Sequence, residues 1–341
     1  MFPVGFTFDV IEEYTNPNDL VVDPFVGRGT SVYAAGALAR RGFGVEINSV
    51  GWTFGTVKLA PARRTAVLRR LQEISSNSVR LSLPVLPDFF TWCYAPRIRR
   101  FLTLAREELN WRDSLVDRTA MSMLLLYAHG DRKNSLSNQM RQTKAMAPNY
   151  SVNWWKDRDL RPPNIDPIEF LDSRLAWRYR HGRPTFRNCA IALGDSTKVL
   201  GNYHRRLESK WSLLLTSPPY SGLVNYRYDQ WLRMWLLGGP PHPVVTDGPH
   251  QGWFSNRMKY RNLLLRVFTK LAQSAKRTAT VYVRTDSRVY TRDTTLEVLR
   301  EVFPRKRVRI DQVPIATESQ TQTNLYNGAS PDQGEVDIVL R

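Results

Sequence analysis

The chain has 341 residues, 42% of them apolar, which is enough for one large domain or for a domain with a sizeable insertion. No stretch approaches the roughly 18–20 consecutive apolar residues of a membrane span, and the start lacks the basic and apolar regions of a signal peptide. Lysine and arginine number 49 against 31 acidic residues, a net charge of +18 that favours a polyanionic partner such as nucleic acid. We therefore expect a cytoplasmic protein with no membrane partner.

Cysteine usage predicts neither a metal site nor a disulfide framework. The two cysteines, Cys93 and Cys189, lie far apart and in no CxxC pattern. We interpret both as ordinary core or surface residues and expect no metal ligands.

The first sixty residues predict one α/β unit. A helix is expected over Phe6–Tyr14, a buried strand over Asp19–Asp23, a helix over Ser31–Arg40 and a second strand over Gly42–Ile47. Strand, glycine turn, helix and strand in this order form a right-handed βαβ unit of a parallel sheet.

The middle of the chain, residues 61–184, has a different character. Helical apolar spacing occurs over Arg63–Ile74, Pro96–Leu109 and Asp113–Tyr127, and the stretch from His129 to Pro167 shows little regular pattern. This segment carries 22 basic and 12 acidic residues, a net charge of +10. We interpret residues 61–184 as a mainly helical insertion in the α/β domain.

The α/β pattern resumes at about residue 185. Helices are expected over about 260–275 and over Thr294–Val302. Strands are expected over Ala190–Leu193, Trp211–Thr216, Thr278–Val283, Val308–Val313 and Val336–Leu340, the last two as an edge hairpin.

The segment Asp23–Thr30, which reads DPFVGRGT, has the composition of a ligand-binding turn. Glycines after a strand let the backbone approach a ligand closely, and the next helix points its N-terminus at that ligand. Glu46 ends the next strand, where an acid accepts hydrogen bonds from ribose hydroxyls. By itself, such a turn also occurs in α/β proteins with other functions.

A second segment, Thr216–Tyr220, reads TSPPY and follows an apolar strand. The two prolines fix the backbone and remove two amide donors. The hydroxyl of Ser217 and the carbonyl of Pro218 then face a substrate as acceptors, and Tyr220 offers a ring for stacking. This arrangement suits a planar base with an amino group, although a Pro-Pro turn alone is usually only a turn.

Together, the two segments resemble the amino-methyltransferase family that modifies cytosine N4 or adenine N6 in DNA. Phe2-Pro3 resembles the family's motif X, Asp23–Thr30 motif I, Glu46 motif II, Asp195 motif III and Ser217–Tyr220 the catalytic motif IV. The resemblance covers roughly residues 1–60 and 185–341. It implies a Rossmann-like methyltransferase fold, α/β in class, with a mostly parallel sheet and an antiparallel edge hairpin, in which these two parts form the catalytic domain.

The resemblance also implies S-adenosylmethionine as cofactor and a role for each site residue. Asp23 and Gly27 would hold the methionine part, Glu46 the ribose and Asp195 the adenine amino group. The full cofactor-binding set is Phe2, Pro3, Asp23, Pro24, Phe25, Gly27, Gly29, Thr30, Glu46 and Asp195. The catalytic set is Ser217, Pro218, Pro219 and Tyr220.

The expected reaction is direct methyl transfer to cytosine N4, because serine opens motif IV. Asp or Asn at that position would favour adenine N6. Attack on a cytosine ring carbon would need a thiolate nucleophile. In the enzyme family that methylates this carbon the cysteine follows a proline, but here Cys93 follows Trp92 and Cys189 follows Asn188. Three alternatives stay open: adenine N6 in DNA, an RNA amino-methyltransferase, and an inactive nucleic-acid-binding module.

The resemblance implies double-stranded DNA as the main partner, in a bacterial or archaeal cytoplasm and at the nucleoid when bound. Whether a cognate restriction endonuclease is a second partner stays open. The insertion at 61–184 is a candidate target-recognition region, in which Ser135–Lys144 and the nearby Asn149–Ser151 offer polar groups to base edges and phosphates. Tyr282–Asp286 is expected to line the target pocket, and Gln320–Tyr326 to help hold a flipped base.

Overall fold

The computed structural model describes residues 2–203, 210–219, 226–244, 256–313 and 334–341. The chain divides into two compact units. Unit 1 comprises Met1–Leu59, Phe186–Val224 and Thr246–Arg341, and unit 2 comprises Ala60–Thr185 and Asn225–Val245.

Unit 1 is built on a seven-stranded sheet with the strand order β3-β2-β1-β4-β5-β7-β6. Strands β3, β2, β1, β4 and β5 run parallel, whereas β7 is antiparallel to both β5 and β6. This order confirms the expected Rossmann-like methyltransferase fold, with the β6–β7 hairpin at one edge. The strands are β1 (Leu20–Asp23), β2 (Arg41–Glu46), β3 (Cys189–Leu193), β4 (Trp211–Thr216), β5 (Ala275–Asp286), β6 (Val308–Val313) and β7 (Glu335–Leu340).

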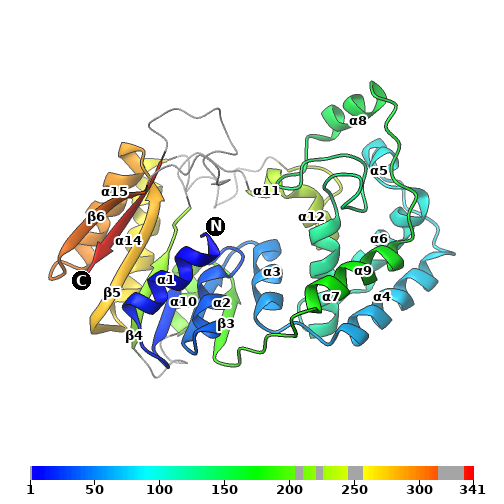
Figure 1. Cartoon of the computed structure of the whole chain (residues 1–341). Coiled ribbons are helices and arrows are strands. Elements are labelled where there is room, and N and C mark those ends of the chain that lie inside the picture. Colours follow the sequence, from blue (N-terminus) through cyan, green and yellow to red (C-terminus); the bar gives the residue numbers. More distant parts are fainter. Residues whose placement is uncertain (1, 204–209, 220–225, 245–255, 314–333) are drawn as a thin grey trace. The chain divides into compact units, whose positions relative to one another are not determined.

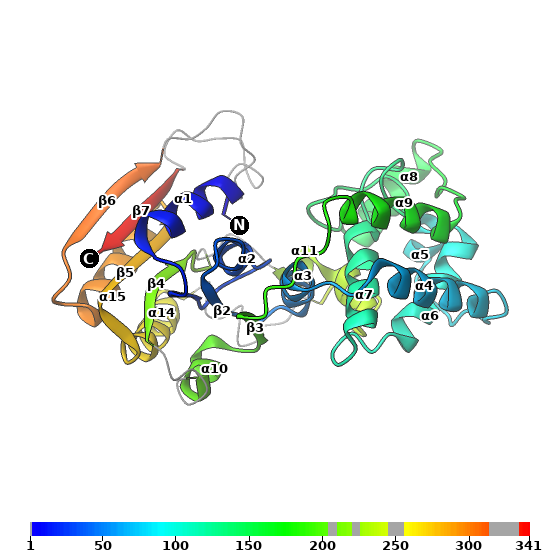
Figure 2. The ribbon, with the colours of Figure 1, turned by 60° about the horizontal axis from the view of Figure 1, so that its bottom comes forward.

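Helices cover both faces of this sheet, as Figures 1 and 2 show. One face carries α1 (Val4–Tyr14), α2 (Thr30–Ala37) and α3 (Ser49–Leu59). The other carries α10 (Ser196–Tyr203), α14 (Arg257–Ala272) and α15 (Val289–Val302). Strand β4 is buried along its whole length because helices cover it on both sides, which explains its continuous apolar run.

Strands β5 and β7 are joined by a buried ion pair as well as by backbone hydrogen bonds. Arg284 Nε and Nη2 donate to the two carboxylate oxygens of Asp337, each at 2.7 Å. Tyr282 donates its hydroxyl to the same carboxylate at 2.8 Å, and the guanidinium lies 3.6 Å from the centre of the Phe6 ring. These contacts fix the edge hairpin to the face that carries α1.

Unit 2 is helical, and its core is rich in aromatic rings. Phe90 packs with its ring centroid 4.6 Å from that of Trp235 and 6.2 Å from that of Trp231. The helices are α4 (Arg64–Ser78), α5 (Asp88–Cys93), α6 (Pro96–Glu108), α7 (Leu115–Tyr127), α8 (Pro148–Lys156), α9 (Pro167–Tyr179), α11 (Tyr226–Asp229) and α12 (Trp231–Leu236).

Helix α8 lies inside the stretch that the sequence predicted to be irregular. Pro148 occupies its first turn, where a missing amide donor costs nothing. Its buried residues, Ser151, Val152 and Trp155, recur at helical spacing. The many surrounding Pro, Asn and Trp residues made the helical spacing of these few apolar residues hard to recognise in the sequence.

Residues 225–245 belong to unit 2, although the sequence analysis placed them in the 185–341 part of the chain. The reason is visible at Arg233, which is only 1% exposed. Its guanidinium donates to the carbonyls of Leu125 and Gln142 and to the side chain of Gln230. A buried guanidinium needs such partners, and unit 2 supplies all three.

No helix in the described parts of the chain is both long enough and apolar enough to cross a membrane.

The buried pair on β5 and β7 yields a stability prediction. Asp337→Ala leaves the buried guanidinium of Arg284 with only the carboxylate of Glu335, 3.8 Å away, as counter-charge, so we expect the free energy of unfolding to fall by about 3 kcal/mol. Asp311→Ala removes an exposed ion pair with Arg309 on the same hairpin and should cost no more than about 1 kcal/mol. Denaturant unfolding of both variants checks this, and equal small losses would contradict it.

Candidate functional site

Four of the predicted site residues stand at one edge of the sheet in unit 1. Asp23 and Glu46 are the last residues of β1 and β2, while Asp195 and Ser217 follow β3 and β4 within two residues. These four strands are neighbours and parallel, so their carboxyl ends share an edge. Ligands of doubly wound sheets bind at this edge.

The glycine loop before α2 lies against a glycine face of α3. A side chain at Gly29 would place its Cβ 2.9 Å from the Cα of Gly55, and one at Gly51 would come 2.9 Å from the carbonyl oxygen of Gly27. Gly27 and Gly29 also have φ values of +56° and +78°, which favour glycine. By contrast, the space where a Cβ of Gly27 would lie is open, with nothing within 4 Å. The loop therefore has a packed side and an open side.

Helix α2 begins directly after this loop without a side-chain cap. Gly29 is its N-cap residue and offers no side-chain acceptor, and Thr30, which is buried, starts the first turn. The first amide groups of a helix have no partner within it and attract anionic groups. This end of α2 can therefore hold a carboxylate or a phosphate.

Asp23 connects this loop to the end of β4. Its Oδ1 accepts hydrogen bonds from the Phe25 amide at 3.0 Å and from the Thr216 hydroxyl at 2.6 Å, and its Oδ2 accepts one from the Ser31 hydroxyl at 2.5 Å. Burial raises the pKa of Asp23 to about 6, and these three donors oppose the rise. Ser217 directly follows Thr216, so Asp23 holds the start of the double-proline segment beside the glycine loop.

Glu46 connects the same loop to the end of β2. Its carboxylate accepts hydrogen bonds from the Gly27 amide at 2.8 Å and from the Asn48 amide at 2.7 Å, one on each oxygen. Burial raises its pKa to about 7, and the nearby carboxylate of Asp23 adds to the rise. Each oxygen keeps a second lone pair, so Glu46 can still accept two hydroxyl donors.

Asp195 directly precedes α10, in the loop after β3. Its Oδ1 accepts hydrogen bonds from the amide and hydroxyl of Thr197, and no Oδ2 partner occurs among the described residues. Ser196 donates to the Pro24 carbonyl at 2.5 Å, and the Gly194 amide donates to the Glu46 carbonyl at 2.8 Å. The ends of β1, β2 and β3 are thus hydrogen-bonded to one another.

The two residues expected to line the cofactor pocket from motif X differ in exposure. Phe2 is buried in an apolar cluster, with its ring centroid 5.5 Å from that of Phe6. Pro3 is exposed, and its carbonyl accepts the Thr7 amide at the start of α1. Phe25 is partly buried against the core on the α14 and α15 face. Their cofactor contacts stay predictions.

The catalytic set is only partly described. Ser217 and Pro219 are half-buried and Pro218 is buried, immediately after β4. Tyr220 and the expected base-holding loop Gln320–Tyr326 lie outside the described residues.

Two segments that were expected to contact the target are largely engaged inside their own units. On β5, Arg284 binds Asp337, and Asp286 binds Arg288 through both carboxylate oxygens. In the Ser135–Lys144 segment, three of the polar side chains are fully buried, so this part cannot reach base edges; they are Ser135, Ser137 and Asn138. Arg141 and Lys144 stay accessible in part.

The sequence analysis missed the hydroxyl groups that hold the site together. Thr216, Ser31 and Ser196 each donate to a group on another element. Each lies beside a recognised motif, at a strand end or in the first turn of a helix. This position in the sequence could have predicted their role. Within the described residues, no cluster of three or more His, Cys, Asp or Glu residues is placed to hold a metal ion.

Comparisons with known proteins give one family match. A family model described as DNA methylase matches residues 1–50, which include α1, the glycine loop and Glu46. No curated protein matches the chain.

Solved structures share only weak overall similarity with the chain. The rRNA methyltransferase AviRa from Streptomyces viridochromogenes has a TM-score of 0.34 and 12% identity, over 100% of this chain and 85% of that one. An rRNA methylase from Streptococcus thermophilus has a TM-score of 0.37 and 8% identity, over 100% of this chain and 96% of that one. A precorrin 8w decarboxylase from Methanobacterium thermoautotrophicum has a TM-score of 0.39 and 8% identity, over 100% of this chain and 91% of that one. Scores this low say nothing about what this chain binds or modifies.

Removing the hydroxyl of Thr216 should weaken the whole edge. In Thr216→Val the buried carboxylate of Asp23 loses a donor, so we expect the free energy of unfolding to fall by about 1–3 kcal/mol. Thr280→Val is the matched control on the adjacent strand, because its hydroxyl bonds to no carboxylate among the described residues. Denaturant unfolding should show a loss for Thr216→Val alone, and similar values for both would count against the role of the Asp23 bond.

The raised pKa of Glu46 predicts the pH dependence of stability. A carboxyl group whose pKa is higher in the folded protein stabilises the fold fully below its ordinary pKa of 4.5, and this contribution is lost as the pH rises through about 7. Glu46→Gln should therefore reduce the fall in unfolding free energy between pH 5 and 7.5 by roughly 1–3 kcal/mol. Part of the pH dependence of the unfolding free energy should remain in this variant, because the pKa of Asp23 is also raised, to about 6.

The control for this titration is Glu12→Gln, at an exposed position of α1. It should keep the pH dependence of the unsubstituted protein. An unchanged slope in Glu46→Gln, measured by denaturant unfolding at each pH, would refute the assignment.

Proposed function

We propose that the chain is an S-adenosylmethionine-dependent methyltransferase that acts on an exocyclic amino group of a nucleic-acid base, with cytosine N4 in DNA as its target. The observation that carries the proposal is the 2.6 Å hydrogen bond from Thr216 to Asp23. It holds the glycine loop and the Ser217-Pro218-Pro219 segment side by side at the ligand-binding edge of the sheet. A cofactor loop and an amino-group acceptor must be neighbours for methyl transfer.

The residues present fit the cofactor in three places. The open side of the loop at Gly27 and the uncapped start of α2 suit its amino-acid part, because amide groups there attract a carboxylate. Glu46 retains lone pairs for two ribose hydroxyls, and Asp195 retains an oxygen for the adenine amino group. When bound, S-adenosylmethionine would supply an electrophilic methyl group.

The double-proline segment supplies the acceptors for the target base. Pro218 and Pro219 have no amide hydrogens, so no backbone N–H of these two residues competes with the amino group of the base for the acceptors. The Ser217 hydroxyl and the Pro218 carbonyl accept its two N–H bonds, which favours a tetrahedral nitrogen with a free lone pair. Holding this nitrogen in line with the methyl group supplies most of the rate. In a duplex the base must first leave the stack, at a cost of a few kcal/mol.

Three features support the choice of substrate. The net charge of +18 suits a nucleic acid, the family model that matches residues 1–50 is described as DNA methylase, and serine opens the double-proline segment. Serine in this position resembles the cytosine-N4 members of the amino-methyltransferases. Adenine N6 and RNA are the alternatives that the experiment below distinguishes.

Product analysis tests the proposal directly. The full chain is incubated with methyl-labelled cofactor and either duplex DNA or RNA, and the nucleic acid is then digested to nucleosides. We expect label in N4-methylcytosine from DNA. Label only in N6-methyladenine would reassign the base, label only in RNA would reassign the substrate, and no transfer to either would overturn the proposal.

A matched pair of variants links the product to the site. Ser217→Ala should lower kcat about tenfold or more, since it removes one acceptor of the amino group, and should leave cofactor affinity in calorimetry unchanged. Ser212→Ala removes a serine at the opposite end of the same strand, whose hydroxyl bonds to Asp19, and should leave kcat within twofold.

A further inference from the structure

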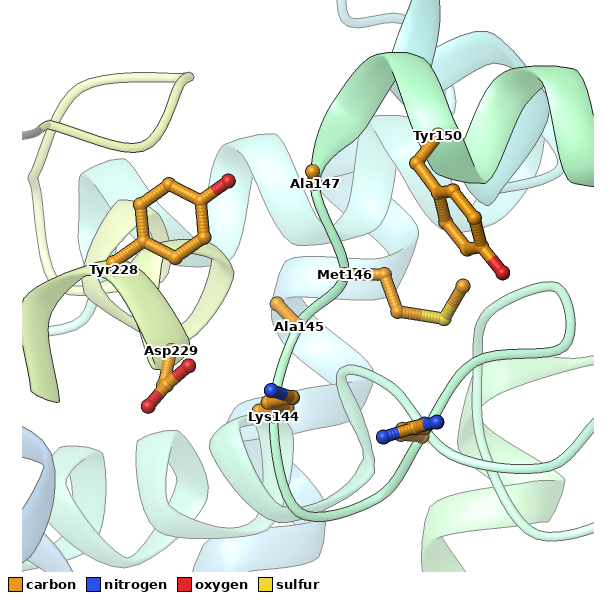
Figure 3. Close-up of a pocket in the computed structure, with 8 residues that line it drawn as sticks. Lys144, Ala145, Met146, Ala147, Tyr150, Tyr228 and Asp229 are labelled. Carbon is orange, nitrogen blue, oxygen red and sulfur yellow. The ribbon is translucent and has the colours of Figure 1, made fainter. Parts of the chain in front are cut away.

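Unit 2 contains a pocket of about 260 Å³ that the proposed methyl transfer does not use. The residues that give it its chemistry are Arg141, Lys144, Met146, Tyr150, Tyr228 and Asp229. Figure 3 shows Tyr228 and Asp229 on α11, the segment from Lys144 to Ala147 beside them, and Tyr150 in the first turns of α8 with its ring near the thioether of Met146.

The two walls of this pocket are fixed to each other by hydrogen bonds. Three donors from residues 230–233 reach carbonyl groups of the loop 142–146: Gln230 to Thr143 at 3.2 Å, Trp231 to Met146 at 3.3 Å and Arg233 to Gln142 at 2.9 Å. The Ala145 amide donates back to the Asp229 carbonyl at 2.9 Å. Because Arg233 is itself buried, the pocket is held in shape before any ligand enters.

The lining groups match the three parts of a nucleotide. Tyr150 is 57% exposed, and Tyr228 offers a second ring, so a base can stack on an aromatic face. Arg141 is exposed, its guanidinium has no partner among the described residues, and with Lys144 it provides positive charge for a phosphate. The Asp229 carboxylate is a hydrogen-bond acceptor suited to the amino group of a base.

Charge and size narrow the choice of occupant. Residues 60–185 and 225–245 carry 24 basic and 13 acidic side chains, a net charge of +11, so the unit attracts a polyanion. The pocket volume is just below the roughly 300–1,000 Å³ of ordinary small-molecule sites. That volume suits a single nucleotide better than a folded peptide.

We infer that this pocket binds one unpaired nucleotide of the nucleic-acid strand, with its base on the tyrosine rings and its phosphate at Arg141 and Lys144. The inference rests on the proposed function, because it assumes that unit 2 binds the same nucleic-acid strand that unit 1 methylates. A paired base keeps both faces stacked in the duplex, so only a nucleotide outside the stack offers a face to the rings. The pocket would therefore favour unpaired over paired strands.

Fluorescence anisotropy with the full chain tests this inference. The probes are a labelled 12-nucleotide single strand of DNA, the same sequence as RNA, and the DNA duplex. Tyr150→Ala should weaken single-strand binding roughly five- to hundredfold, whereas Tyr150→Phe, which keeps the ring, should bind as the unsubstituted protein does. Arg141→Ala should weaken binding and reduce the salt dependence by about one phosphate contact.

Arg80→Ala is the matched control, since Arg80 is an exposed arginine of the same unit outside the pocket. A loss in Arg80→Ala as large as in Arg141→Ala would overturn the inference, because overall charge alone would then explain binding. Unchanged binding in both Tyr150→Ala and Arg141→Ala would also overturn it. The DNA and RNA probes identify which strand supplies the nucleotide.

Cofactor binding separates this inference from the proposed function. Tyr150 and Arg141 are exposed in unit 2, so calorimetry should give every variant the cofactor affinity of the unsubstituted protein. If the unsubstituted protein binds no cofactor, the proposed function fails while the nucleotide result stands. If it binds cofactor but the pocket variants keep full strand affinity, the pocket inference fails alone.

Discussion

The candidate site depends on one buried carboxylate, that of Asp23. Its three donors come from the glycine loop, from the first turn of α2 and from the last residue of β4. A buried carboxylate is costly unless such donors surround it, and the raised pKa of Asp23 reflects that cost. Any movement of the double-proline segment away from the loop would leave this carboxylate short of a donor. This part of the site is therefore held together by a buried group that is costly to leave without its hydrogen-bond donors.

Close packing of glycines sets a second constraint on the same loop. Gly51 and Gly55 on α3 let the backbone from Gly27 to Gly29 approach to distances that any Cβ would block. Glu46 then accepts the Gly27 amide from the other neighbouring strand. The loop is thus positioned by contacts with β2, α3 and β4, and its open side is left for a ligand. A loop fixed by so many elements can act as a binding site without reorganising first.

The segment that follows β4 leads along the sequence from unit 1 into unit 2. The chain leaves β4 through Ser217, Pro218 and Pro219, and seven residues after Pro219 it enters α11, which forms one wall of the nucleotide pocket inferred for unit 2. In the proposed function, the segment that accepts the target amino group and the segment that binds an unpaired nucleotide are therefore consecutive. The positive charge of unit 2 would add an attraction for the strand that does not depend on base sequence.

The sequence by itself determined the elements whose signals are local. Continuous apolar runs identified β1 and β4, and the motifs around Asp23 and Ser217 marked two loops at strand ends, which the parallel strand order brings to one edge. Only the tertiary structure decided which groups join those loops, because the bond from Thr216 to Asp23 spans 193 positions and depends on β4 lying beside β1. The same holds for Arg233, whose burial assigns residues 225–245 to unit 2, and for Ser137 and Asn138, which look like an exposed polar loop in the sequence but are buried. Local patterns report the backbone period and the turn chemistry, whereas partners distant in the chain are set by which strands and helices pack together.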